Sequence, residues 1–274
     1  MIYDCFLYYD EDMLLDLRLN VLNDYVDKFV IVESTHSFTG LPVELHFDIN
    51  KFSKFKDKII YVVFDEKPDA DCWTNESRTR NAIMKGLEGA KDDDTIIISD
   101  VDEIIHPDAI AKHKPYYLCS VLYQTFYNYQ FNLQVFNKDG KARICPAPRI
   151  TSYKNLKTFF MGQPETLRNL KRSALHKQWF KWNYLKFRTK TIQNGGWHFS
   201  WIMTAERISE KMSTISHTEY DTPELNNQEH IQNAIENGLD IWARERNLKV
   251  VDLQSGDFPE YLKQNAQKFA EFIR

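Results

Sequence analysis

The sequence predicts an α/β fold in which helices flank a mixed, mainly parallel central sheet. Apolar strand-like runs alternate with helical patterns through the first hundred residues, which is typical of βαβ units. The fourth of these runs stops abruptly at several carboxylates, and the pattern then changes to longer strands and a hairpin turn. At 274 residues the chain is long enough for a substantial core. We expect one domain over residues 1–274, with an α/β half at 1–104 and a mixed half with C-terminal helices at 105–274.

The elements of the first half follow from the spacing of their apolar residues. Residues 2–8 form an apolar strand pattern, and residues 12–22 carry apolar side chains at helical spacing with Asp10 or Asp12 available as the N-cap. Further strands are predicted at 28–32, 59–64 and 96–98, with a helix at 73–87.

The second half is predicted to be partly antiparallel. Residues 137–140, Asn-Lys-Asp-Gly, are typical of a hairpin turn. Residues 193–196, Gln-Asn-Gly-Gly, read as a flexible loop that would serve as a lid beside a site. Strands are expected at 116–129, 131–136 and 142–145, an apolar segment at 197–201, and an amphipathic helix at 259–272.

Composition and charge exclude several classes of protein. A net charge of −4 argues against a general nucleic-acid binder. No Cys-x-x-Cys spacing occurs, so we expect reduced cysteines rather than a zinc site or a disulfide framework. The chain enters a strand pattern at once, and no stretch reaches the roughly 18 apolar residues of a membrane span. We therefore expect a cytoplasmic protein without a transmembrane segment, which leaves room for peripheral contact with a membrane.

The run from Thr95 to Glu103 is the most informative feature of the chain. A strand rich in β-branched residues ends there at three carboxylates, those of Asp100, Asp102 and Glu103. In open α/β sheets, ligands bind at the carboxyl ends of the strands. Residues i and i+2 of a strand face the same side, so Asp100 and Asp102 can converge on one ligand where the strand ends. Carboxylates brought together in this way suit Mg²⁺ or Mn²⁺.

Asp-x-Asp by itself is a weak signal. It occurs four times in this chain, and the other three copies lie in polar stretches that read as caps or solvated loops. A helix-capping role therefore remains an alternative for the acidic run. The other copies are Asp10/Asp12, Asp69/Asp71 and Asp92/Asp94.

Taken together, several segments resemble glycosyltransferase family seventeen, the family that includes the β-1,4-mannosyl-glycoprotein N-acetylglucosaminyltransferases. They are the acidic run, the helix before it with its arginines, and Gly195 to Ser200 about a hundred residues later. Phe38-Thr39-Gly40, Glu206 and Lys211 complete the likeness, which covers residues 1 to about 215.

The resemblance implies a GT-A fold, a UDP-sugar donor with GlcNAc as the expected sugar, a divalent ion (Mn²⁺ or Mg²⁺) and inversion at the anomeric carbon. The acceptor would be a glycan or glycolipid. Asp102 is the best direct metal ligand, His198 would complete the metal shell, and Asp100 would act through water or on the ribose. Glu103 is expected to be ion-paired or capping. Nucleotide contacts are expected from Glu33 or its adjoining loop, Arg78, Arg80, Asn81 and Asp100.

An inverting transfer needs a carboxylate within hydrogen-bond reach of the acceptor hydroxyl. Glu206 is the first candidate for this base, with Glu165 and Glu219 as rivals. Two other readings stay open at this point. One is a carbohydrate-binding protein without catalytic turnover. The weaker one is an Asp-dependent phosphatase, in which the Asp-x-Asp motif is expected after the first strand.

Overall fold

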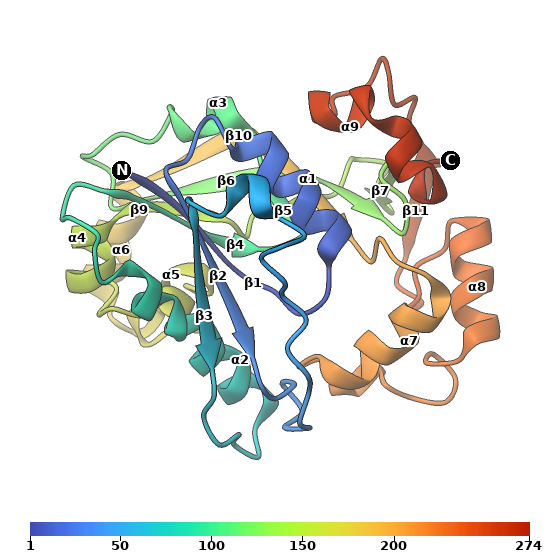
Figure 1. Ribbon diagram of the computed structural model, residues 1–274, viewed down its shortest axis with the longest axis horizontal. Coiled ribbons are helices and arrows are strands. Elements are labelled where there is room, and N and C mark those ends of the chain that lie inside the picture. Colours follow the sequence, from blue (N-terminus) through green and yellow to red (C-terminus); the bar gives the residue numbers. More distant parts are fainter.

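A computed structural model describes all residues, 1–274, as an α/β fold built on an 11-stranded mixed sheet (Figure 1). The longest ladders in the sheet are parallel, namely those of β6 with β10, β1 with β4 and β2 with β3. The fold class predicted from the sequence is confirmed. The strands are β1 (Ile2–Leu7), β2 (Lys28–Ser34), β3 (Ile59–Phe64), β4 (Thr95–Asp100), β5 (Glu103–Ile105), β6 (Cys119–Asn128), β7 (Leu133–Asn137), β8 (Ile144–Cys145), β9 (Arg149–Ser152), β10 (Thr189–Ser200) and β11 (Arg246–Val250).

The first half of the chain forms the parallel part of the sheet. Strands β4, β1, β2 and β3 lie side by side in that order, so their carboxyl ends share one edge. The predicted helix at 73–87 is an α-helix, α2 (Cys72–Asn81), followed by a 3-10 helix at Ala82–Leu87. Helix α1 (Asp12–Leu22) has the predicted bounds, but its N-cap position is Glu11, and no side chain caps it.

Two hydrophobic clusters cover the two faces of this parallel sheet. Ile97 of β4 belongs to the cluster that contains α1, whereas Ile96 and Ile98 belong to the cluster that contains the 3-10 helix. Because side chains alternate along a strand, an apolar run such as Ile96 to Ile98 is buried on both faces. This explains why the strand is continuously apolar until it reaches its carboxylates.

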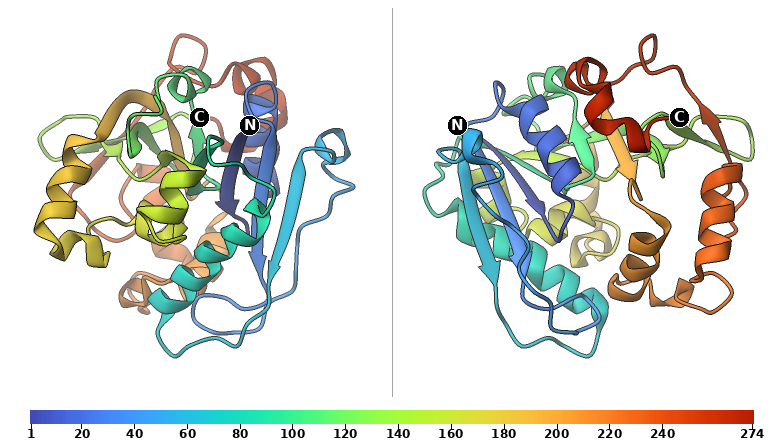
Figure 2. Two further views of the ribbon diagram at one scale, coloured as in Figure 1. Left: turned by 90° about the vertical axis from the view of Figure 1, so that its left-hand side faces the viewer. Right: turned by 45° about the vertical axis from the view of Figure 1, so that its right-hand side comes forward.

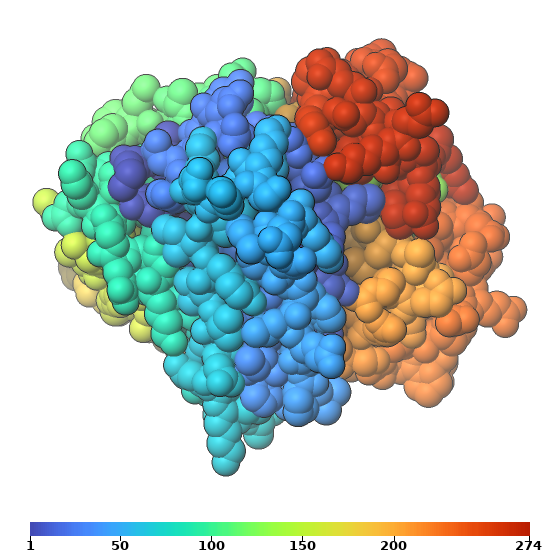
Figure 3. Space-filling model, viewed as in Figure 1, coloured from blue at the N-terminus to red at the C-terminus, as the bar shows by residue number.

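The second half extends the same sheet with antiparallel pairs and one parallel ladder, that of β6 with β10, and surrounds it with short helices. Strands β5, β9 and β11 were not expected from the sequence, and β5 and β9 are only three and four residues long. The C-terminal segment packs against α1 (Figures 2 and 3) as α9 (Glu260–Gln264) and a 3-10 helix, Ala266–Phe272. The other helices are α3 (Pro107–Ile110), α4 (Tyr153–Thr158), α5 (Pro164–Arg168), α6 (Trp179–Phe187), α7 (Ala205–Thr214) and α8 (Gln228–Asn237).

The predicted flexible loop at 193–196 is wrong, because these residues belong to β10. The two glycines allow close approach of neighbouring strands. A Cβ on Gly196 would lie 2.1 Å from the carbonyl oxygen of Ile104, and one on Gly195 would lie 2.7 Å from Cβ of Leu122. Gly196 also has φ +134°, a backbone conformation that favours glycine. The glycines therefore serve tight strand packing rather than a lid.

All four cysteines are free, as expected, and Cys5, Cys119 and Cys145 are buried. No helix of the structure has both the length and the apolar composition needed to cross a bilayer.

Candidate active site

A cavity of about 800 Å³ opens at the carboxyl edge of the parallel strands. Its wall includes Leu7 and Tyr8 at the end of β1, Ser34 just behind Glu33 at the end of β2, and both Asp100 and Asp102. Nine Lys or Arg side chains line it against four carboxylates, so its interior favours an anionic ligand. The cations are Arg80, Arg143, Arg149, Arg168, Lys171, Arg172, Lys211, Arg244 and Arg246, and the carboxylates are Glu11, Glu76, Asp100 and Asp102.

A completely buried arginine, Arg18 of α1, holds the acidic turn in shape. Its Nη1 donates to the carbonyl oxygens of Asp100 at 2.8 Å and Glu103 at 3.0 Å, on either side of the turn that follows β4. Its Nε and Nη2 donate to the two carboxylate oxygens of buried Asp4 at 2.8 and 2.6 Å. The charge-assisted hydrogen bonds of Arg18 therefore fix the backbone of this turn, and the carboxylates of Asp100 and Asp102 can face one cavity.

Asp100 is an anchor for arginines. Arg80 Nη1 donates to its Oδ1 at 2.8 Å and Arg168 Nη2 to its Oδ2 at 2.7 Å, so both oxygens are occupied. Although burial raises the pKa of Asp100, these two cations bring it well below its ordinary value. A carboxylate held in this way stays ionised and is a poor base. The network extends from Arg80 to Glu76 and Glu165 at 2.6 and 2.8 Å.

Asp102 behaves differently, because its carboxylate accepts no hydrogen bond within the protein. Its Oδ2 lies 3.6 Å from Nε2 of His198, and burial raises the pKa of Asp102. The imidazole of His198 stacks on Phe126 with ring centroids 4.3 Å apart. Asp102 and His198, the two residues predicted as metal ligands, thus face each other inside the cavity.

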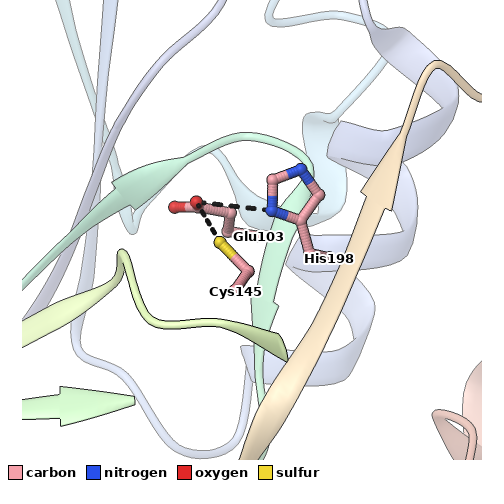
Figure 4. Close-up of side chains that lie close together, drawn as sticks. All are labelled: Glu103, Cys145 and His198. Atoms are coloured by element: carbon pink, nitrogen blue, oxygen red, sulfur yellow. Dashed lines mark hydrogen bonds and ion pairs between the residues drawn. The ribbon is translucent and has the colours of Figure 1, made fainter. Parts of the chain in front are cut away.

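The other side of the His198 ring faces Glu103 and Cys145 (Figure 4). Its Nδ1 lies 3.5 Å from Oε1 of Glu103 and has no hydrogen-bond partner. Burial alone would lower the pKa of His198, but Cys145 and Asp102 raise it well above its ordinary value. Glu103 is buried and ion-paired with Arg168 at 2.6 Å, which agrees with the ion-paired role expected for it. Its carboxylate favours a proton on Nδ1, so Nε2 is the nitrogen that would bind a metal ion, which would take the place of its proton.

Three of the five predicted nucleotide-binding residues do not line the cavity. Glu33 is buried and accepts hydrogen bonds from Tyr61 and from the backbone of its own loop, although the adjoining Ser34 and His36 do reach the cavity. Arg78 pairs at the surface with Glu66.

Asn81 accepts a hydrogen bond from the backbone N–H of Glu165, so it is occupied in joining two helices. Arg78 and Arg80 separate because residues two apart on a helix point in nearly opposite directions. Of the predicted set, only Arg80 and Asp100 line the cavity.

The predicted catalytic base, Glu206, also lies outside the cavity. It is exposed in the first turn of α7, whereas Lys211 on the same helix lines the cavity and donates to Glu11 at 2.9 Å. Five residues along a helix correspond to a rotation of about 140°, so the two side chains cannot share one face. The rivals do not reach the cavity either, because Glu165 binds Arg80 and Asn169, and Glu219 is an exposed partner of His217.

The sequence analysis missed most of the cationic wall. Arg143 and Arg149 flank Cys145, and neither forms an ion pair with a carboxylate, whereas Arg244 and Arg246 share Asp240 at 2.9 and 3.0 Å. Arginines are more frequent after residue 140, but Arg244 and Arg246 reach the cavity only because β11 pairs with β7.

Comparison with known proteins adds an independent line of evidence. The family model of glycosyltransferase family 17 matches residues 1–161. The human β-1,4-mannosyl-glycoprotein 4-β-N-acetylglucosaminyltransferase is 24% identical over 282 residues, covering 93% of this chain and 52% of the human protein. The mouse enzyme is 23% identical with similar coverage. The chain spans about half the length of the curated relatives it matches.

Solved structures give only distant likenesses. The 2-C-methyl-D-erythritol 4-phosphate cytidylyltransferase of Francisella tularensis has a TM-score of 0.40 at 10% identity and covers 78% of this chain and 99% of its own. A glycosyltransferase involved in glycosylation of the major capsid of PBCV-1 has a TM-score of 0.31 at 12% identity, covering 70% and 80%.

The family match spans more than half of the chain and includes the acidic turn and Arg18, which holds that turn in shape. The chain belongs to glycosyltransferase family 17.

Proposed function

We propose that this protein is an inverting, metal-dependent glycosyltransferase that moves a sugar, GlcNAc in the first place, from a UDP-sugar to a glycan hydroxyl. The observation that carries the proposal is the pair Asp102 and His198, whose free ligand atoms are 3.6 Å apart in a strongly cationic cavity. The names of the relatives support GlcNAc as the sugar.

The donor has a natural orientation in this cavity. The carboxyl ends of parallel strands are where nucleotides bind in α/β sheets, so the nucleoside belongs near Ser34, His36 and Trp73. The diphosphate then lies toward Asp102, with Lys211 and Arg172 in the wall to balance its charge.

The residues present fit a divalent ion. Asp102 supplies a carboxylate oxygen that is free of hydrogen bonds, and His198 supplies Nε2, a donor set that suits Mn²⁺ better than Mg²⁺ because one ligand is an imidazole nitrogen. A bound ion would neutralise the charge that develops on the leaving diphosphate. Asp100, whose two oxygens bind arginines, serves instead to position Arg80 and Arg168.

Glu76 replaces Glu206 as the candidate general base. Of the four cavity carboxylates, Asp100 and Glu11 have both oxygens engaged, and Asp102 is assigned to the metal. Glu76 accepts a hydrogen bond from Arg80 through Oε1 only, which leaves Oε2 free to accept a proton from an acceptor hydroxyl.

A first prediction concerns the metal shell. His198→Ala should weaken Mn²⁺-dependent UDP binding by about 10–100-fold and should recover part of it at raised Mn²⁺, since one ligand is lost and another remains. Calorimetric titration of UDP at two Mn²⁺ concentrations measures this. His113→Ala is the matched control, because His113 is a half-buried histidine that binds Ser120 away from the cavity. Equal weakening by both variants would show a general loss of structure.

A second prediction separates the two glutamates. Glu76→Gln should lower transfer by about 10²–10⁴-fold while UDP affinity in Mn²⁺ is kept, because a general base acts in the chemical step rather than in donor binding. Glu206→Gln should transfer sugar at a near-normal rate. Rates of UDP release with an acceptor provide the measurement. If only Glu206→Gln severely lowered the transfer rate, Glu206 on α7 would be the general base.

A non-catalytic carbohydrate-binding protein on the same fold is the alternative. It predicts that UDP-sugars bind without turnover. A screen of UDP-sugars for Mn²⁺-dependent release of UDP, with and without sugar acceptors, decides between the two.

A further inference from the structure

A second feature of the molecule lies outside the cavity, in the segment that contains α6. From 166 to 205 the chain has no acidic residue, and residues 171–190 contain seven lysines and arginines. The whole chain has a net charge of −4, so this excess of positive charge is local. Four of the five lysines in this stretch lie on or beside α6, and all four are exposed and form no ion pair; they are Lys177, Lys181, Lys186 and Lys190. The segment therefore presents unbalanced cations to solvent.

The same segment exposes large aromatic side chains. Trp179, Phe180 and Phe187 of α6 are 69%, 81% and 83% exposed, and Tyr184 is 48% exposed. Only Leu185 of this helix is buried. Burial of apolar surface is the main source of folding free energy, so three rings left in water on one short helix indicate a surface that meets something else.

The basic aromatic surface is continued by the loop before β6. Arg188 donates to the carbonyl oxygen of Tyr116 at 2.6 Å, and Tyr116 is 59% exposed. Lys112 and Lys114 of this loop lie beside Lys190. Helix α6 lies at the outer edge of the molecule (Figure 2), where a flat partner can reach it.

We propose that this surface, α6 with the flanking loop, docks on an anionic lipid membrane. Tryptophan, tyrosine and phenylalanine with interspersed lysines are the residues that bind the interface of a bilayer, where rings lie at headgroup depth and lysines meet anionic headgroups. A second copy of the chain is a poorer occupant, because a symmetric contact would bring two surfaces of the same positive charge together.

Docking would also orient the catalytic cavity. Lys171 and Arg172 line the cavity and lie a few residues before α6, so the membrane surface and the cavity wall are parts of one continuous segment. This orientation suits an acceptor held at a membrane. The docking itself does not depend on the proposed donor or metal.

Sedimentation with lipid vesicles tests the proposal. The wild-type protein should sediment with vesicles of phosphatidylcholine and phosphatidylglycerol, should bind pure phosphatidylcholine much less, and should be released by salt, because the attraction is partly electrostatic. The triple variant Trp179→Ala, Phe180→Ala, Phe187→Ala should bind anionic vesicles at least about tenfold more weakly. The double variant Lys181→Glu, Lys186→Glu should lose the preference for anionic lipid.

Matched controls use exposed residues elsewhere. Tyr25→Ala removes an aromatic ring that is 51% exposed, and Lys138→Glu with Lys141→Glu reverses two exposed lysines. Both controls should bind vesicles as the wild type does, and circular dichroism should show unchanged unfolding in all variants. The proposal would be overturned if the wild-type protein did not bind anionic vesicles, or if the triple variant bound them equally well. It would also be overturned if the wild-type protein and the controls were dimers on gel filtration and the triple variant were a monomer.

Discussion

We expect the Asp102→Asn protein to bind UDP no more tightly with Mn²⁺ than without it, and to lose more than about a hundredfold in sugar transfer. The reason is that Asp102 is the cavity carboxylate that accepts no hydrogen bond from the protein, so its oxygens are available to a metal ion. An amide of the same shape keeps the packing but removes that charge. UDP titrations with and without Mn²⁺, together with rates of UDP release, measure both effects.

Another copy of the Asp-x-Asp pattern supplies the control for this experiment. Asp92 has an exposed side chain and pairs with Lys157 at the surface, so Asp92→Asn should change neither metal-dependent binding nor transfer. Asp102→Asn protein that keeps the full Mn²⁺ dependence of UDP binding would contradict the metal assignment. If Asp102→Asn bound UDP normally in Mn²⁺ but did not transfer sugar, Asp102 would act in the chemical step rather than as a metal ligand.

The second large effect should come from Arg18→Met, which we expect to lower the free energy of unfolding by about 3–5 kcal/mol. Arg18 and Asp4 form a fully buried ion pair, and removal of the cation leaves the Asp4 carboxylate buried without a partner. The same change releases three backbone carbonyl oxygens of the acidic turn. Urea unfolding followed by fluorescence measures the loss, and UDP binding in Mn²⁺ should weaken in parallel.

A double variant makes the reason for that loss testable. Asp4→Asn combined with Arg18→Met removes both charges, so it should be more stable than the sum of the single variants predicts. Lys138→Met breaks an exposed ion pair with Glu245 and should leave the urea midpoint unchanged. If Arg18→Met unfolds at the wild-type midpoint, the buried network does not hold the turn.

The sequence by itself determined the parallel half of this protein. Strong local signals fixed it, since the strand at Ile96 to Ile98 is apolar on both faces and the helix at 12–22 repeats at helical spacing. The acidic turn was also recognisable, because ligands bind at the carboxyl ends of strands in α/β sheets, and His198 was recognisable through the family resemblance.

Only the tertiary structure decided which charged side chains enter the cavity. Glu206 and Lys211 lie on one helix, as do Arg78 and Arg80, and the direction of each depends on how its helix packs against the sheet. The arginine wall depends in the same way on β11 pairing with β7 across more than a hundred residues of chain. The local sequence pattern determines which element forms, but long-range packing determines which face of that element points toward a site. The roles of Asp100, Glu33 and Arg18 depend on this long-range packing.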